Sequence, residues 1–87
     1  MKKTFADLEK DEKATSAQLL EALTDYADGQ WAISAPVVIA LVERTKPDAV
    51  QMHSLCQAAA RGLAVQTRNK ETEAANEYKR LLNYLTR

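Results

Sequence analysis

The stretch SAPVVIALVERTKPDAV, residues 34–50, contains both prolines of the chain and its longest apolar run. Pro36 stands two residues after Ser34. Pro47 stands in the same way two residues after Thr45. Proline is tolerated in the first turn of a helix because the amides there have no intrahelical partner, and serine and threonine are common N-caps. Each proline therefore predicts the start of a helix, with Ser34 and Thr45 as the N-caps.

The segment between the prolines predicts a short helix over about 36–45. Its first turns are apolar almost all round, and they consist of Val37, Val38, Ile39, Ala40, Leu41 and Val42. A helix of this kind must be covered on several sides by other elements. We therefore expect this short helix to be the central and most buried element of the fold.

A longer helix is expected from Pro47 to about residue 66. Asp48 places a negative charge near the positive end of the helix dipole, which favours a helix start at this point. Several small residues follow within the helix, namely Ala58, Ala59, Ala60, Gly62 and Ala64. Small side chains of this kind would permit another helix to approach closely.

The clearest helix upstream of this stretch spans residues 16–28. Thr15 and Gln18 have the spacing of a capping box, in which each side chain bonds to the backbone amide of the other residue. Gly29 can supply the left-handed backbone that commonly ends a helix. Residues 1–14 are mostly charged, so we expect a frayed or weakly docked helix there.

The last helix is expected over about 70–86, after a polar joint at 67–70. The dominant residues of the chain are good helix formers, and no hairpin signal separates alternating apolar segments. The sequence therefore predicts an all-α fold, a small three- to four-helix bundle, within a single domain over residues 1–87.

Composition narrows the classes of function. Of the 87 residues, Lys and Arg together number 12, as do Asp and Glu, so the formal net charge is zero. Proteins that bind nucleic acid usually carry an excess of positive charge, so nucleic acid is not expected as the main partner. The single cysteine fits a reducing compartment, and the start of the chain lacks the apolar run of a signal peptide. No apolar run approaches the roughly 20 residues of a membrane span. We expect a cytoplasmic protein.

The side chains that could carry chemistry are sparse. His53 and Cys56 are three residues apart on one helix, a spacing that can supply two metal ligands. A zinc site needs four ligands, or three and a water, and the chain has no other His or Cys. Gly29 and Gly62 are isolated, so there is no glycine-rich phosphate loop. We therefore expect no catalytic residue, no metal and no cofactor.

Surface aromatic and leucine residues are the remaining candidates for function. Trp31 either covers the end of the small core or serves as an anchor for a partner, because tryptophan is over-represented at interface hot spots. A stripe at helical spacing in the last helix either closes the intramolecular bundle or forms a seam with a second copy or a partner. The stripe consists of Tyr78, Leu81, Leu82 and Leu85. Together with Trp31 these are the predicted partner-binding residues.

Part of the opening stretch, PVVIALVERTKPDAV at 36–50, resembles the theta subunit of bacterial DNA polymerase III. That family has a Pro-Val helix start, a Val-Glu-Arg helix end, a short step, and then Pro followed by an acidic residue. The matching positions here are Pro36, Val37, Val42, Glu43, Arg44, Pro47 and Asp48. The following helix is alanine-rich, where the family carries Arg and aromatic residues. The resemblance implies a non-catalytic subunit that binds and stabilises a proofreading exonuclease.

These observations leave three hypotheses for function. The first is a small, non-catalytic protein–protein interaction module, with the exonuclease-binding accessory subunit as its specific form. The second is a helical adaptor or inhibitor of the kind that phages and plasmids encode. The third is a small DNA-binding regulator, for which the neutral charge predicts little affinity. A homo-oligomer is compatible with each of them.

Overall fold

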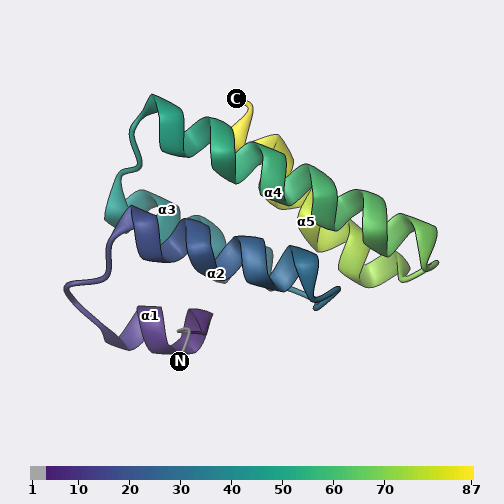
Figure 1. The fold of residues 1–87 in the computed structure, drawn as a ribbon, viewed down its shortest axis with the longest axis horizontal. Coiled ribbons are helices and arrows are strands. Elements are labelled where there is room, and N and C mark those ends of the chain that lie inside the picture. The colour runs from purple at the N-terminus through teal and green to yellow at the C-terminus, as the bar shows by residue number, and fades with distance from the viewer. Residues whose placement is uncertain (1–3) are drawn as a thin grey trace.

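The computed structural model describes residues 4–87 and contains five helices with no strand in that range (Figure 1). The helices are α1 (Phe5–Lys10), α2 (Ser16–Asp28), α3 (Ala35–Thr45), α4 (Ala49–Arg68) and α5 (Thr72–Leu85). The all-α prediction is confirmed, whereas the expected count of three to four helices is too low. None of the helices described over residues 4–87 combines the length and apolarity needed to cross a membrane.

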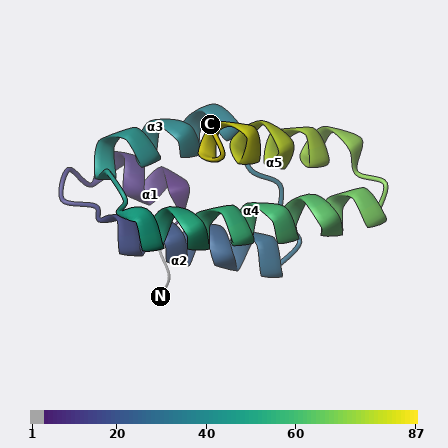
Figure 2. The same cartoon turned by 90° about the horizontal axis from the view of Figure 1, so that it is seen from above.

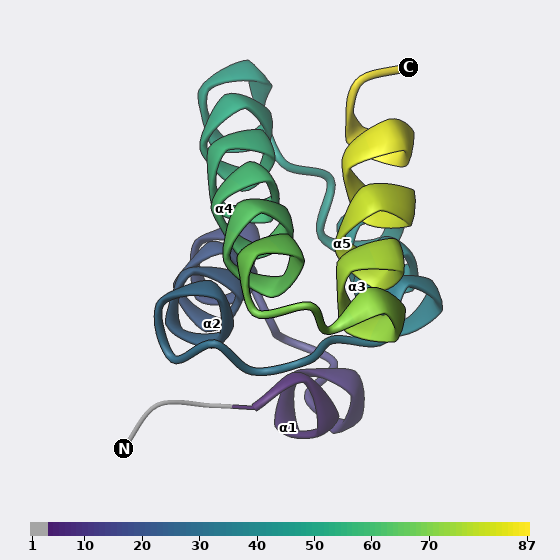
Figure 3. The same ribbon diagram turned by 90° about the vertical axis from the view of Figure 1, so that its right-hand side faces the viewer.

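The four longer helices form two pairs that lie side by side. Seen from the end of the bundle, α4 lies above α2 and α5 lies above α3, with α1 beneath them (Figure 3). The view from above shows that α2 and α4 run along one side and α3 and α5 along the other (Figure 2). Helix α4 makes the most extensive helix contacts of the bundle, against α2 and α5.

The short helix α3 is therefore not the central element that its apolar sequence suggested. It buries one face, formed by Ala35, Val38, Leu41 and Val42. Ala40 on the opposite side is exposed, and Val37 and Ile39 are only partly buried. The reason is its place at the side of the bundle, where it is covered by α5, α1 and α2, while no described helix covers its outer surface.

The two prolines act differently from one another. Pro36 lies in the first turn of α3, as predicted, but the Ser34 side chain makes no capping hydrogen bond. Instead the Ala35 amide donates to Glu77 Oε1 of α5, at 3.1 Å. Pro47 lies before its helix, because α4 starts after Asp48, which forms a capping box with Gln51.

Two predicted helix ends are also corrected. Thr45 is the last residue of α3, where its hydroxyl donates to the Leu41 carbonyl at 2.8 Å, so it is not an N-cap. The capping box of Thr15 and Gln18 is confirmed. At the other end of α2, Gly29 keeps a right-handed backbone, and the left-handed residue is Gln30, with φ of 61°.

Helix α1 is docked rather than frayed. Thr4 and Asp7 form a capping box, and Phe5 and Leu8 are buried. The Arg44 guanidinium of α3 donates to backbone carbonyl oxygens at and just after the C-terminal end of α1. These carbonyls belong to Leu8, Glu9 and Asp11. The first three residues of the segment predicted to fray lie outside the described residues.

Helices α4 and α5 approach closely where a glycine faces an aromatic ring. A Cβ built on Gly62 would lie 2.2 Å from Tyr78 Cε1, so only glycine leaves room for the ring. Ala58 and Ala59 are buried along the same helix. The close approach that the small residues of α4 permit is therefore made at Gly62.

Candidate interaction surface

The α2–α3 link, residues 29–34, carries the exposed aromatic residue of this structure. The side chain of Trp31 is 60% exposed. Among the large hydrophobic residues of the described part of the chain, only Trp31 and Val50 are exposed. Val50 lies in the first turn of α4, at the opposite end of the bundle from the link (Figure 1). The two side chains therefore do not form one patch.

Contacts with other aromatic rings hold the indole of Trp31 at the surface. Its ring meets Tyr26 of α2 edge-on, with centroids 5.4 Å apart and planes at 83°. The Tyr26 ring in turn lies 4.4 Å from that of Phe5 in α1. Edge-to-face pairs at such distances are favourable, so the indole has a defined seat although most of its area meets solvent.

The backbone of the α2–α3 link is fixed by side chains of α4 and α5. The Tyr78 hydroxyl donates to the Trp31 carbonyl at 2.7 Å. Gln66 Nε2 donates to the Gln30 carbonyl at 3.0 Å, and Asn69 Nδ2 donates to Gln30 Oε1 at 3.1 Å. These three bonds hold the left-handed turn at Gln30 and so determine where the next residue, Trp31, presents its side chain.

Gln66 is a functional candidate that the sequence analysis missed. It is 3% exposed, which is rare for a glutamine and is explained by its bond to the Gln30 carbonyl. The sequence contained an indication of this burial, because Gln66 continues the buried face of α4 at helical spacing. That face consists of Leu55, Ala59, Gly62 and Gln66. A glutamine in line with apolar residues indicates a buried polar contact.

The predicted stripe of α5 belongs mainly to the core. Tyr78, Leu81 and Leu85 are buried within the bundle, and Leu82 is partly buried. Burial, with a smaller contribution from Tyr26, raises the pKa of Tyr78 to about 12. Of the two interpretations given above, the structure places these three buried side chains in the intramolecular bundle. They therefore offer no surface to a partner, and Trp31 is the exposed member of the predicted set.

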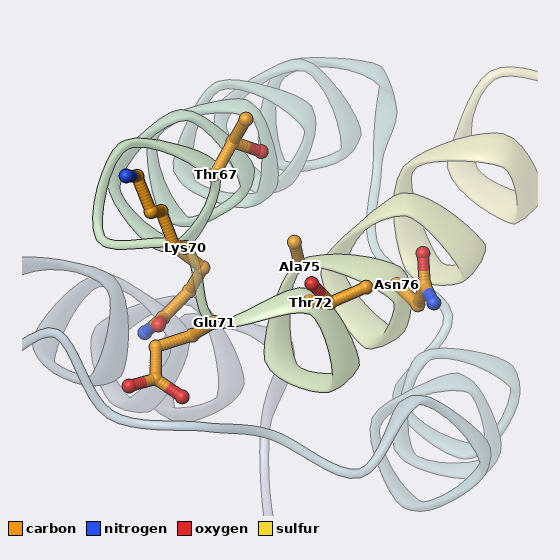
Figure 4. Close-up of a pocket in the computed structure, with 7 residues that line it drawn as sticks. Thr67, Lys70, Glu71, Thr72, Ala75 and Asn76 are labelled. Carbon is orange, nitrogen blue, oxygen red and sulfur yellow. The ribbon is translucent and has the colours of Figure 1, made fainter.

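Two hollows of the described surface lie along the N-terminal half of α5. One of about 220 Å³ at the α4–α5 turn is lined by Gln66, Thr67, Lys70, Glu71, Thr72, Ala75 and Asn76. Figure 4 shows Lys70 extending over the end of α4 and Glu71 toward the α2–α3 link, so their charges point away from Asn76. The other hollow, of about 380 Å³, is lined by Glu73, Asn76, Glu77 and Arg80, all on α5. Glu77 there already accepts from Ala35 and pairs with Arg80 at 3.1 Å.

The candidate metal ligands are not brought to a common site. His53 is exposed, and Cys56 is partly buried against the core. Within residues 4–87, no three His, Cys, Asp or Glu side chains are grouped so that they could hold a metal ion. The arrangement on which a function can be argued is therefore the Trp31 surface: Trp31, its neighbour Tyr26 and the fixed Gln30 turn.

Comparisons of the chain with family models, with curated proteins and with solved structures found no match.

Proposed function

We propose that this protein is a small, non-catalytic protein–protein interaction module that binds its partner through the Trp31 surface. The observation that carries the proposal is a tryptophan residue, 60% exposed, on a backbone that α4 and α5 hold in place. Tryptophan is among the residues most enriched at binding hot spots.

The rigidity of the α2–α3 link supports this function, because a link that became ordered only on binding would lower the affinity for the partner. A side chain or loop that is immobilised only on binding costs conformational entropy, roughly 0.5–1.5 kcal/mol per side chain. Tyr78 and Gln66 have already ordered the link in the free protein.

A narrower proposal follows from the resemblance of residues 36–50 to the theta subunit: the partner is a proofreading exonuclease. The structure gives intramolecular roles to several of the matching residues, among them Asp48, which caps α4. Pro36 lies in the first turn of α3, and Arg44 holds α1. The narrower proposal therefore depends on identifying the partner and not on these residues alone.

Affinity capture with paired variants tests the proposal. We expect Trp31→Ala to lose a partner that the wild-type chain captures from a bacterial cell extract, while circular dichroism shows unchanged helix content. Val50→Ala is the matched control, since it removes the other exposed large side chain, at the far end of the bundle. Equal capture by all three proteins would refute the Trp31 surface. Capture of a partner other than an exonuclease would refute only the narrower proposal.

A further inference from the structure

The charges of this neutral protein are divided unevenly along the chain. Residues 1–45 contain eight Asp or Glu and five Lys or Arg, whereas residues 46–87 contain four and seven. The first part therefore carries a net charge of −3 and the second a net charge of +3. Trp31 belongs to the negative part, in a segment without any charge of its own, since no charged residue lies between Asp28 and Glu43.

Exposed carboxylates lie on two sides of the α2–α3 link. Asp28 is the last residue of α2, whose last turn contains no basic residue to offset the negative end of the helix dipole. From the α4–α5 turn, Glu71 points toward the link (Figure 4). The basic neighbours offset these charges little, because Lys70 extends over the end of α4 and Arg61 meets Asp28 only in an exposed pair at 3.6 Å.

The indole of Trp31 is available for stacking. Its plane lies at 83° to that of Tyr26, so the two rings are not stacked on one another. A Cβ added at Gly29 would lie 3.5 Å from Cδ1 and Nε1 of the indole, so the glycine leaves this part of the ring without a covering side chain. An exposed aromatic ring in negative surroundings favours a cation, because the face of the ring is itself negative.

We propose that the Trp31 surface binds an arginine-rich segment of a partner protein. One guanidinium stacks on the Trp31 indole, and neighbouring arginines pair with Asp28 and Glu71. Arginine suits both contacts, since its planar guanidinium stacks on aromatic faces and donates two parallel hydrogen bonds to a carboxylate. This inference rests on the proposed function and adds the chemistry of the partner.

Other occupants fit this surface less well. An apolar segment would remove water from the carboxylates without pairing them, and an acidic segment would be repelled. A second copy could offer its positive half, residues 46–87, to the negative half of the first. That contact would join two different surfaces, so it would propagate from copy to copy into a filament. A basic segment of another protein ends the contact at one partner.

Fluorescence titration of the full chain tests the proposal, because Trp31 is its single tryptophan. The probe is the peptide ARRARRA, acetylated and amidated, and the matched control is AQQAQQA. We expect the arginine peptide to change the Trp31 emission and to bind at least about 10-fold tighter than the glutamine peptide. Raising NaCl from about 50 to about 500 mM should weaken this binding, because exposed charges are screened. Equal binding of the two peptides, or binding by neither, would overturn the proposal.

Paired variants test the two carboxylates. Asp28→Asn combined with Glu71→Gln should weaken binding of the arginine peptide at least about 5-fold, with unchanged helix content by circular dichroism. Glu12→Gln is the matched control, since Glu12 is exposed on the α1–α2 connection at the other end of the bundle (Figure 1). Undiminished binding by the double variant would overturn the proposal.

The two proposals fail on different results. The peptides decide the chemistry of the occupant, whereas partner capture by Trp31→Ala decides the proposed function. Capture that is lost with Trp31→Ala, together with equal binding of the two peptides, would overturn the arginine-rich partner and leave the Trp31 surface standing. A chain that forms filaments at low salt, seen by light scattering, would overturn the choice of another protein as the occupant.

Discussion

The ring of Tyr78 lies directly over the backbone of Gly62, and its hydroxyl donates to the carbonyl of Trp31. One side chain of α5 thereby joins the tightest helix contact of the bundle to the link that carries the exposed indole. The stability of the core and the geometry of the Trp31 surface are therefore coupled through Tyr78.

Gly62→Ala is expected to destabilise the protein. Its methyl group would lie 2.2–2.5 Å from three ring atoms of Tyr78, and overpacking of this kind costs about 1–3 kcal/mol. The better helix propensity of alanine offsets about 1 kcal/mol of that cost. Urea denaturation measures the net change. Ala60→Gly, at an exposed position of α4, is the control for propensity alone. A Gly62→Ala protein more stable than the wild type would contradict the tight contact.

Tyr78→Phe is expected to change how stability depends on pH. The folded pKa of Tyr78 is raised to about 12 from 10.0, because burial disfavours the phenolate. The unfolded chain therefore loses this proton near pH 10, while the folded chain keeps it to about 12. The stabilisation is complete below pH 10 and is lost as the pH rises to about 12.

Urea midpoints measured between pH 9 and 12 check this prediction. The wild-type midpoint should fall more steeply than that of Tyr78→Phe, because the variant lacks the hydroxyl whose pKa burial raises. At neutral pH the variant should be less stable by about 1 kcal/mol, because the bond to the Trp31 carbonyl is lost. Parallel curves over this range would show that Tyr78 is not protected from ionisation.

Gln66→Leu is expected to weaken partner capture although it leaves Trp31 in place. The substitution removes the Gln66 side-chain amide that donates to the Gln30 carbonyl, which lowers the free energy of unfolding by about 1–3 kcal/mol. The link then has more freedom, and binding must order it. Capture should fall in a protein that still melts cooperatively. Thr67→Ala, the exposed neighbour of Gln66 on α4, is the control.

Val38→Asp is expected to destabilise the domain strongly. Val38 is fully buried, and a buried unpaired charge costs about 3–5 kcal/mol against a typical total of about 5–15. Ala40→Asp, on the exposed side of the same helix, should melt close to the wild type. A cooperative melt of Val38→Asp within a few degrees of the wild type would contradict the burial of α3.

The sequence predicted those features that local chemistry determines. Thr15 and Gln18 cap α2, and Pro36 opens α3, because each effect acts within one helical turn. Competing local signals explain the misplaced ends. Asp48 finds a reciprocal partner in Gln51, so it becomes the N-cap in place of Thr45.

The features that the sequence did not reveal depend on contacts between distant residues. Arg44 docks α1 by reaching carbonyls more than 30 positions earlier, which no local pattern indicates. The stripe of Tyr78 and Leu81 has the same spacing whether it faces its own bundle or a partner. Only the position of α5 beside α4 and α3 shows which of the two it contacts. Trp31 could be identified as a candidate, but its exposure depends on the long-range bonds of the link.

The hydrogen bonds that hold the α2–α3 link also bear on the order in which the protein matures. Synthesis proceeds from the N-terminus, so Trp31 is made well before Gln66 and Tyr78, the residues that fix its backbone. A nascent chain that has not yet reached Tyr78 holds its indole on a link without these bonds. The ordered Trp31 surface therefore arises only after α5 has been synthesised and packed, which delays binding until the bundle is complete.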